Sequence, residues 1–386
     1  MKIAVVGAGL GGVAAAVGLR REGHEVTLFE RGAELREAGT GVVLMPNGTA
    51  ALDELGLAER VRGEAMAAGN AGLRDWRGRD LLVTDAAEAQ RHIGAALVLD
   101  RAELHRMLRA PLPGDVVRTG TPIERLEPRA DGVRLISEGD EVADADAVIV
   151  ADGIRSRLRA QLFPAHPGVV GTGRVDLRGT LLAPRGLDVR DLLAGVMIDR
   201  RTGAMFGLFP LGLSAETDGL YWYSETPLGD TSTDPAEARD QVLAQLGGWH
   251  PTVLALIAAT PAEAVYADPI ARLAEPLPTL ALGRIALLGD AAHAMSPDLG
   301  QGASQAFEDA AAITRHLSGA TSSEAGQRLL GYDAERRPRT TRMMRASSRQ
   351  SRLTTQTGPA AWVRDMLLRM VPAKLATRRL ATIWHV

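Results

Sequence analysis

The sequence predicts an α/β protein with a Rossmann-like domain, a β-sheet-rich middle part and a C-terminal helical segment. Three observations favour this fold class. Residues 1–30 follow a strand–helix–strand pattern, residues 165–270 are rich in short strands, and residues 321–386 are helical and rich in arginine. The chain has 386 residues, more than one hydrophobic core usually holds, so we expect more than one folded unit.

The chain begins with a predicted βαβ unit. Ile3–Val6 is a short apolar run, residues 10–21 carry apolar side chains at helical spacing, and residues 26–29 form a second strand. A helical crossover of this kind makes the two strands parallel neighbours. Residues 145–150 and 284–288 are further buried strands of the same type.

The last part of the chain combines apolar and basic residues between Trp362 and Trp384. A basic amphipathic helix can lie on an anionic membrane, but such a helix more often covers a core surface. Membrane contact is therefore not expected. No run in the chain approaches the roughly 18 apolar residues of a membrane span.

Composition excludes several kinds of chemistry. The chain has no cysteine, so disulfides, thiolate nucleophiles and cysteine-based zinc sites are impossible, which is compatible with the cytoplasm. The eight histidines show no metal-ligand spacing, and no metal site is predicted. A formal net charge of −3 gives no broad basic surface for nucleic acid.

Gly7-Ala8-Gly9-Leu10-Gly11-Gly12 fits the GxGxxG pattern of a dinucleotide-binding turn. The motif follows a strand and opens a helix, and Glu30 lies at the end of the second strand. Gly7 permits the tight turn, Gly9 lets the backbone approach a pyrophosphate, and Gly12 lets helix and strand pack closely. Glu30 can accept hydrogen bonds from ribose hydroxyls. The motif leaves open whether the dinucleotide is NAD or FAD.

Three later segments resemble those of one enzyme family. Asp152-Gly153 with Ser156 and Arg159 is similar to a DGxxSxxR segment, and Arg101–Leu104 to an RxxL element. Residues 289–293 read GDAAH and are followed by Pro297 and the Gly300-Gln301-Gly302 turn. Together with the glycine motif, and in their order along the chain, these segments resemble the single-component (group A) flavin monooxygenases, the family of p-hydroxybenzoate hydroxylase and salicylate hydroxylase.

The resemblance implies a fold of the glutathione reductase type 2 (GR2), p-hydroxybenzoate hydroxylase kind. Its FAD-binding domain would be discontinuous, at residues 1–72, 99–165 and 270–320. Residues 73–98 and 166–269 would form the substrate-binding β-rich domain, and residues 321–386 the C-terminal helices. In this family NADH or NADPH binds transiently and reduces FAD, and O2 then adds to form a C4a-hydroperoxide that oxygenates an aromatic ring.

The resemblance also implies FAD contacts for individual residues. Asp290 would hydrogen-bond the ribityl chain, and amides at Gly300 and Gly302 would stabilise negative charge on the reduced ring. His293 is expected to be structural. The full set of expected cofactor residues is Gly7, Gly9, Leu10, Gly11, Gly12, Glu30, Arg31, Val43, Arg101, Asp152, Gly289, Asp290, Pro297, Gly300, Gln301, Gly302 and Ala303. One departure concerns Ser304, where many relatives have asparagine.

The β-rich middle is expected to cover the flavin and bind substrate. Alternation places Met205, Gly207 and Phe209 on one face of a strand, and Tyr221 and Tyr223 on one face of another. These residues are candidates for an aromatic-lined pocket, although the same pattern fits plain sheet core. Urate-hydroxylase-like members of the family have an arginine at the position of Met205, so the resemblance favours an apolar ring over a charged purine.

The one acidic residue expected near the flavin ring is Asp298. We hypothesise that it accepts a hydrogen bond from a substrate hydroxyl or amine and acts in catalysis. A solvated loop carboxylate would give the same sequence pattern.

Hydroxylation of a small or medium aromatic compound, phenolic or heteroaromatic, is the predicted function, and specialised metabolism is one setting for it. Epoxidation, Baeyer–Villiger insertion and dearomatisation use the same cofactor chemistry and stay open. A flavin-binding redox sensor is the non-enzymatic alternative. Halogenases need a lysine beside the flavin, and the only lysines are Lys2 and Lys374. A monomer and a homodimer fit equally.

Overall fold

The computed structural model describes most of the chain. The described residues are 1–35, 40–68, 72–85, 88, 94–182, 187–189, 192–193, 195–212, 218–229, 232 and 234–384.

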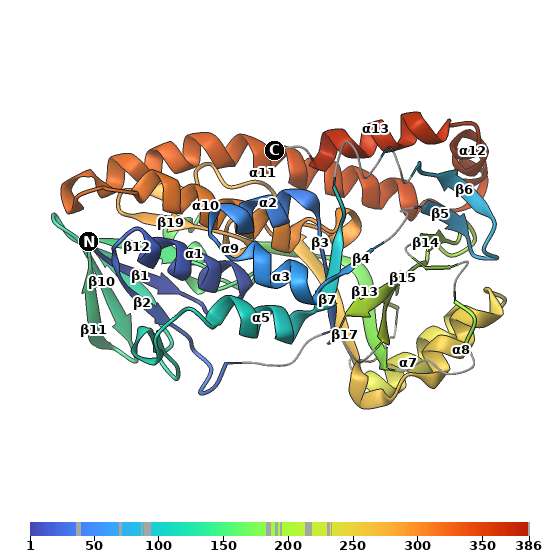
Figure 1. Cartoon of the computed structure of the whole chain (residues 1–386), viewed down its shortest axis with the longest axis horizontal. Coiled ribbons are helices and arrows are strands. Elements are labelled where there is room, and N and C mark those ends of the chain that lie inside the picture. Colours follow the sequence, from blue (N-terminus) through green and yellow to red (C-terminus); the bar gives the residue numbers. More distant parts are fainter. Residues whose placement is uncertain are drawn as a thin grey trace.

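A parallel sheet forms the centre of the first half of the molecule (Figure 1). β1 (Lys2–Val6) pairs in parallel with β2 (Glu25–Phe29) and with β12 (Ala147–Val150), as the βαβ pattern predicts. The β12 strand is buried along its whole length, as expected for a strand covered on both faces. The sheet has the order β18-β19-β12-β1-β2-β8 and is completed by β8 (Val117–Arg118), β18 (Ala281–Leu282) and β19 (Ile285–Leu287).

Helices cover this sheet and begin or end at the loops that follow its strands. Helix α1 (Leu10–Arg21) packs against α10 (Gly302–Leu317), and α10 packs against α2 (Pro46–Glu54). The remaining elements of this half are α3 (Ala58–Glu64), α5 (Arg101–Arg109), α6 (Arg157–Leu162), α9 (Asp290–His293) and a small sheet of β9 (Arg125–Pro128), β10 (Val133–Ser137) and β11 (Asp140–Ala145).

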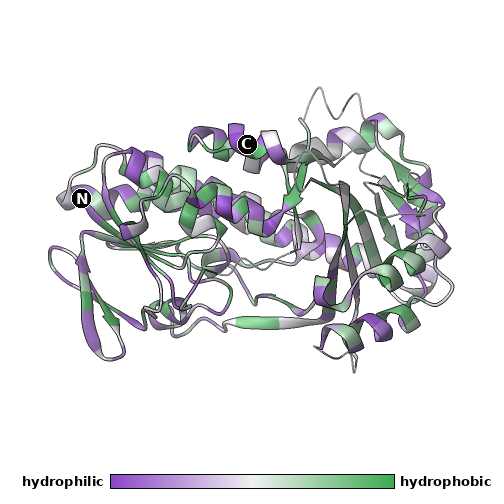
Figure 2. Cartoon of the chain, turned by 60° about the horizontal axis from the view of Figure 1, so that its bottom comes forward, coloured by the Kyte–Doolittle hydropathy of each residue, from purple (hydrophilic) through white to green (hydrophobic). Residues whose placement is uncertain are grey.

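The β-rich half contains a 10-stranded sheet, as the middle of the sequence predicts. Its main path is β17 (Val265–Leu273), β13 (Val169–Leu182), β16 (Asp218–Pro227), β15 (Met205–Gly212), β14 (Gly195–Ile198), β5 (Gly72–Asp75) and β6 (Asp80–Val83). One face packs beneath α7 (Pro235–Gln245) and α8 (Pro251–Ala259). Figure 2 shows hydrophobic residues along the strands of this half.

Three short strands join the two halves. β3 (Gly41–Leu44) and β4 (Met66–Ala67) both pair with β7 (Leu97–Asp100), which itself pairs with β15. Residues 41–67 lie within the first segment expected for the FAD-binding domain, yet their strands extend the sheet of the β-rich half. The segment therefore contributes to both halves.

The C-terminal segment is helical, as predicted. Helix α11 (Ala325–Thr354) runs along the molecule past both halves, and α12 (Gly358–Arg369) and α13 (Ala373–Trp384) lie over β6 (Figure 1). Leu368 packs with residues of the β-rich sheet, while Trp362 and Met370 are exposed. Over the described residues, the structure contains no helix whose length and apolarity would suffice to cross a bilayer.

Candidate active site

The turn between β1 and α1 has the backbone that the glycine motif requires. Gly7 has a φ of +105°, and a Cβ there would lie 2.3 Å from the Ala151 carbonyl oxygen. A Cβ at Gly12 would lie 2.0 Å from the Gly7 oxygen, so its absence lets α1 pack on the turn. At Gly9 no atom lies within 4 Å of the Cβ position. The turn is open at Gly9, where unpaired amides at the start of α1 can meet a phosphate.

Glu30 closes the other side of this turn. Its Oε2 accepts a hydrogen bond from the Ala8 amide at 3.0 Å, and its Oε1 accepts one from the Gly32 amide at 2.9 Å. Each carboxylate oxygen has a further lone pair for a ribose hydroxyl. The next residue, Arg31, is exposed.

The Asp152-Gly153 loop follows the carboxyl end of β12. Ser156 caps α6 by accepting the Arg159 amide at 2.8 Å, and the Arg159 guanidinium donates to the carbonyls of Ala291 at 3.1 Å and Ile154 at 2.7 Å. Arg159 therefore ties this loop to helix α9, a role that the motif alone did not indicate. Asp152 Oδ1 is buried and has no hydrogen-bond partner.

Asp290 begins helix α9 at the end of β19. Its side chain is accessible to solvent, yet desolvation by surrounding protein raises the pKa of Asp290, against the attraction of His293, Arg101 and Arg159. A group that is both accessible and surrounded by protein lies in a recess. Desolvation likewise lowers the pKa of the exposed Arg101, and the nearby Arg178 adds to that effect.

The turn into α10 also presents backbone amides. Gly300 is left-handed with a φ of +61°, and no atom lies within 4 Å of the Cβ position at Gly302. Helix α10 has no side-chain cap at its N-terminus, so the first amides, at Gly302 and Ala303, are available to an anion. Pro297, at the start of the preceding turn, is exposed.

A buried polar network beneath α10 escaped the sequence analysis. Gln301 receives a hydrogen bond from Asn47 at 3.0 Å, and Asn47 also donates to Glu308. Arg336 of α11 pairs with Glu308 and, at 2.7 Å, with Asp309. The charges of Arg336 and its neighbour Arg339 lower the pKa of Glu308 although burial opposes them. These contacts hold the start of α10 in place.

His293 and Ser304 belong to the same supporting structure. His293 is 1% exposed and its Nε2 lies 2.5 Å from Asp309 Oδ2, which agrees with the structural role expected for it. Ser304 Oγ accepts the Met45 amide at 3.2 Å. A Cβ at Gly48 would lie 2.6 Å from that oxygen, so the absence of a side chain at Gly48 lets α2 approach α10.

These loops meet along one edge of the parallel sheet. β19, β12, β1 and β2 are adjacent and parallel, so the loops at their carboxyl ends lie together, where such sheets bind ligands. The open Gly9 and Gly302 positions, the unpartnered Asp152 oxygen and the accessible Arg101 fit a long ligand that carries phosphates and hydroxyls. The expected residues at this edge are Gly7, Gly9, Leu10, Gly11, Gly12, Glu30, Asp152, Gly289 and Asp290.

The β-rich half contributes an aromatic cluster. Phe209 stacks on Tyr221 and on Tyr223, with ring centroids 6.1 Å and 6.3 Å apart. A Cβ at Gly207 would lie 2.2 Å from the Tyr223 ring, so the glycine makes room for that ring. Val43, expected near the cofactor, packs against this cluster. Gly207, Phe209, Tyr221 and Tyr223 are thus brought together.

Met205 lies elsewhere. It is 2% exposed and packs with Leu81 and Ile198 in a separate cluster. On the opposite face of the same strand, Phe206 and Leu208 pack beneath α7 and α8. The predicted alternation along this strand is therefore present, and Met205 occupies sheet core.

Buried charged groups surround the aromatic cluster, and sequence analysis missed them. Asp176 lies 3.2 Å from the Arg178 guanidinium, and burial raises the pKa of Asp176 to about 6. Glu225 is 2% exposed and lies 3.6 Å from Arg174. Burial, together with repulsion from nearby carboxylates, raises the pKa of Glu225 to about 8. These residues sit on strands without a motif, so only tertiary structure reveals them.

Asp298 lies in the short turn before α10 and contacts helix α11. Thr354 Oγ1 donates to its Oδ1 at 3.3 Å, while Oδ2 is buried without a partner. Burial raises the pKa of Asp298, and its charge acts on both Tyr223 and Glu225. Electrostatic interactions therefore connect Asp298 with the β-rich half, and Arg101 with Arg178.

Comparisons with known proteins agree with this architecture. The model of the FAD binding domain family matches residues 1–347. The chain is 33% identical over 373 residues to 6-hydroxynicotinate 3-monooxygenase of Bordetella bronchiseptica, covering 93% of each chain. It is 33% identical over 376 residues to a 3-amino-4-hydroxybenzoate 2-monooxygenase of Streptomyces platensis, covering 94% of this chain and 91% of the relative.

A solved structure shows the same fold. Klebsiella pneumoniae HpxO complexed with FAD and uric acid superposes with a TM-score of 0.89 at 26% identity, covering 100% of this chain and 96% of that one. The resemblance to the single-component flavin monooxygenases is thereby confirmed. The chain belongs to the FAD-binding domain family and is an FAD-dependent monooxygenase.

Proposed function

We propose that this enzyme uses NADH or NADPH and O2 to hydroxylate a small or medium aromatic compound, phenolic or heteroaromatic. The observation that carries the proposal is the aromatic cluster around Phe209, in which Tyr223 is close enough to the turn before α10 for the charge of Asp298 to act on it. Relatives are named for hydroxynicotinate and aminohydroxybenzoate, and the HpxO structure holds uric acid. Each of these compounds is a polar aromatic or heteroaromatic ring.

The residues at the sheet edge would hold FAD. The amides near Gly9 would bind the pyrophosphate, Glu30 the ribose, and Asp290 with Arg101 the chain that leads to the ring. FAD supplies the oxygen-activating chemistry when it is bound. Amides at Gly302 and Ala303 would stabilise negative charge beside the ring.

The aromatic cluster would orient the substrate. Tyr223 and Phe209 offer ring faces against which an aromatic substrate can stack. Burial raises the pKa of Tyr223 well above its ordinary value, so its hydroxyl stays protonated and can donate a hydrogen bond. The Arg178 guanidinium, which pairs with Asp176 and Asp268, adds a positive charge on this side.

Asp298 would accept a hydrogen bond from a substrate hydroxyl or amine and so raise electron density on the ring. Its Oδ2 is buried and has no hydrogen-bond partner in the described structure, so a substrate donor that reaches it would satisfy this oxygen. Asp298→Asn keeps the size of the side chain and removes its charge. We expect a fall in kcat of roughly 100-fold, the usual scale of general-base assistance, with flavin content unchanged. An unaltered rate and pH profile would remove Asp298 from catalysis.

The direct test is a substrate screen. Phenols and heteroaromatic acids are added to the flavin-loaded enzyme with NADH or NADPH, while nucleotide oxidation and O2 uptake are recorded. A substrate should stimulate both and yield a hydroxylated product. If no aromatic compound stimulates oxidation, while a non-aromatic one does, the proposed substrate class is wrong.

The division into domains, the cytoplasmic location and the choice between monomer and homodimer stay predictions from the sequence. If domains are assigned by sheet membership, the strands of segment 41–67 belong with the β-rich half and not with the FAD-binding domain, because they pair with β7. Size-exclusion chromatography with light scattering would decide the oligomeric state.

A further inference from the structure

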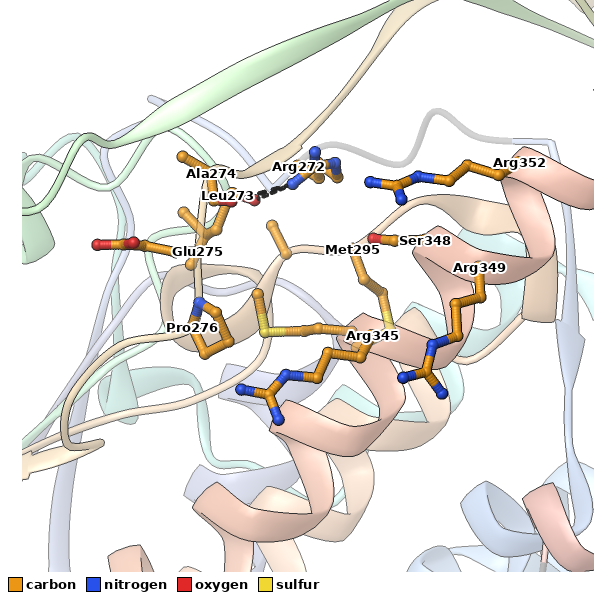
Figure 3. A pocket seen from close by; sticks show the side chains of 12 residues that line it. Arg272, Leu273, Ala274, Glu275, Pro276, Met295, Arg345, Ser348, Arg349 and Arg352 are labelled. Carbon is orange, nitrogen blue, oxygen red and sulfur yellow. Dashed lines mark hydrogen bonds between the residues drawn. The ribbon is translucent and has the colours of Figure 1, made fainter.

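A group of arginines lies outside the site described above. A cavity of about 260 Å³ opens between the end of β17 and helix α11 (Figure 3). Arg272 comes from β17, and Arg345, Arg349 and Arg352 come from α11. We call these four residues and the cavity that they line the arginine pocket.

The arginine pocket concentrates positive charge at the surface. Arg345, Arg349 and Arg352 recur at a spacing that places them on one face of the helix, and all three are exposed. Within the described part of the chain they form no ion pair. The one carboxylate in the lining, Glu275, points away from Arg352 in Figure 3. Like charges at this spacing repel, and an anion between them would relieve the repulsion.

Arg272 is positioned by the backbone. Its guanidinium donates to the carbonyl of Leu273 at 2.8 Å and to that of Ala274 at 3.2 Å. In Figure 3 the guanidinium of Arg352 points toward it from the opposite wall. Two guanidinium groups that face each other across a cavity form the usual arrangement for a phosphate, which accepts paired hydrogen bonds from each.

Apart from Glu275 and Ser348, the rest of the lining is apolar. Met295, Met344 and Pro276 form part of the cavity wall, and Ser348 adds one hydroxyl. A bare ion would gain nothing from the thioether side chains. The lining therefore fits a ligand that joins phosphate groups to a less polar part such as a nucleoside.

The pocket lies directly behind the flavin-side loop. Ala294 and Met295 line it, and they connect α9 to the turn that carries Asp298. Ser347 of α11 donates to the Ser296 carbonyl at 2.5 Å and fastens the helix to this loop. A long ligand anchored in the pocket is therefore held beside the loop that would border the flavin ring.

We propose that the arginine pocket binds the phosphate groups of the nicotinamide dinucleotide that reduces the flavin. The inference rests on the proposed function, which needs NADH or NADPH. The chain has one GxGxxG turn, and FAD would occupy it, so the second dinucleotide needs another phosphate site. Side-chain charges at the surface suit a ligand that binds briefly and leaves.

Anaerobic stopped-flow reduction of the holoenzyme tests the proposal. The double variant Arg345→Gln with Arg349→Gln is compared with Arg342→Gln, an exposed arginine of the same helix that does not line the cavity. We expect the double variant to raise the saturation constant for NADH or NADPH at least tenfold, with the limiting reduction rate within twofold of wild type. The control should leave both values unchanged. An unchanged constant in the double variant would overturn the proposal.

A second measurement does not depend on activity. Inorganic pyrophosphate and oxidised NADP are titrated into the oxidised holoenzyme by calorimetry, and both should bind wild type at least tenfold more tightly than the double variant. Loss of pyrophosphate binding alone, with normal flavin reduction, would show an anion site that the reductant does not use and would overturn the proposal.

Loss of flavin from the double variant and failure of the wild-type enzyme to be reduced are treated separately. If the double variant loses its flavin, Arg352→Gln is measured in the same way, and a saturation constant raised less than about threefold would count against the pocket. If neither nucleotide reduces the flavin of the wild-type enzyme, the proposed function itself fails and the inference fails with it.

Discussion

The flavin half and the β-rich half of this enzyme differ in how the sequence encodes their ligand-facing positions. In the flavin half, which is built on the parallel sheet, most ligand-facing groups are backbone groups at glycine turns. The requirement for these turns therefore appears in the sequence as glycines at fixed spacing. In the β-rich half, side chains such as Asp176, Arg178 and Glu225 lie around the aromatic cluster, and no sequence motif marks them. The comparison teaches that cofactor positions are visible in a sequence when the ligand contacts the backbone.

The largest expected effect is at Gly12. A Cβ at this position would lie 2.0 Å from the Gly7 carbonyl oxygen, which no small adjustment can accommodate. Gly12→Ala should destabilise the protein by more than roughly 3 kcal/mol, beyond the usual cost of overpacking, and abolish flavin binding. Chemical unfolding of the apoprotein measures the loss. Wild-type stability would show that α1 can move away from the turn.

Gly9→Ala is the matched change at an open position. Gly9 has a φ of −72° and no atom within 4 Å of its Cβ position, so the variant should fold with stability within about 1 kcal/mol of wild type. The added methyl would occupy the space through which the pyrophosphate approaches. Flavin titration should then show affinity lowered by roughly tenfold or more, an expectation of about 1.4 kcal/mol. Full affinity would mean that the phosphates lie elsewhere.

Glu225 gives a pH-dependent effect in the β-rich half. Because the folded pKa of about 8 lies above the ordinary value of 4.5, the carboxyl stabilises the fold while protonated. This stability is complete below pH 4.5 and is lost as the pH rises toward 8. In Glu225→Gln, the free energy of unfolding should fall less steeply with pH, by up to roughly 1.4 kcal/mol per pH unit. Urea unfolding across this range measures it.

The control for Glu225 is Glu263→Gln, an exposed carboxylate of the same half. It should keep the wild-type slope. Equal slopes for wild type and Glu225→Gln would show that Glu225 is ionised in the folded protein, and the buried charged cluster would need another explanation.

The smallest effect is expected at Met205. The side chain is 2% exposed and packs with Leu81 and Ile198, so Met205→Leu nearly conserves volume and should cost less than about 1.5 kcal/mol. The KM for an aromatic substrate should stay within twofold of wild type. A clear rise in KM would return Met205 to the substrate pocket.

The sequence allowed the prediction of positions whose structure depends on the local geometry of the backbone. Gly7, Gly12 and Gly300 were recognised because their φ values or close contacts require glycine. Alternation along β15 was also correct, since period-2 patterning follows from strand geometry.

Other features depend on partners that are distant in the sequence. Asn47 meets Gln301 and Glu308, and Glu308 meets Arg336, only after α2, α10 and α11 have packed. Met205 also depends on distant partners. Strand alternation predicts which face of the sheet carries Met205, but it does not predict which residues cover that face. The arginines of α11 line a pocket only because the end of β17 packs beside the helix, and the sequence does not predict this contact.

The most direct test of the account is the origin of the oxygen in the product. An aromatic substrate identified by the screen is turned over under ¹⁸O2, and the product is analysed by mass spectrometry. We predict one ¹⁸O atom in each new hydroxyl group, with one nucleotide oxidised per product. A product that contains no label, or O2 consumption accounted for entirely by hydrogen peroxide, would contradict monooxygenation of that substrate.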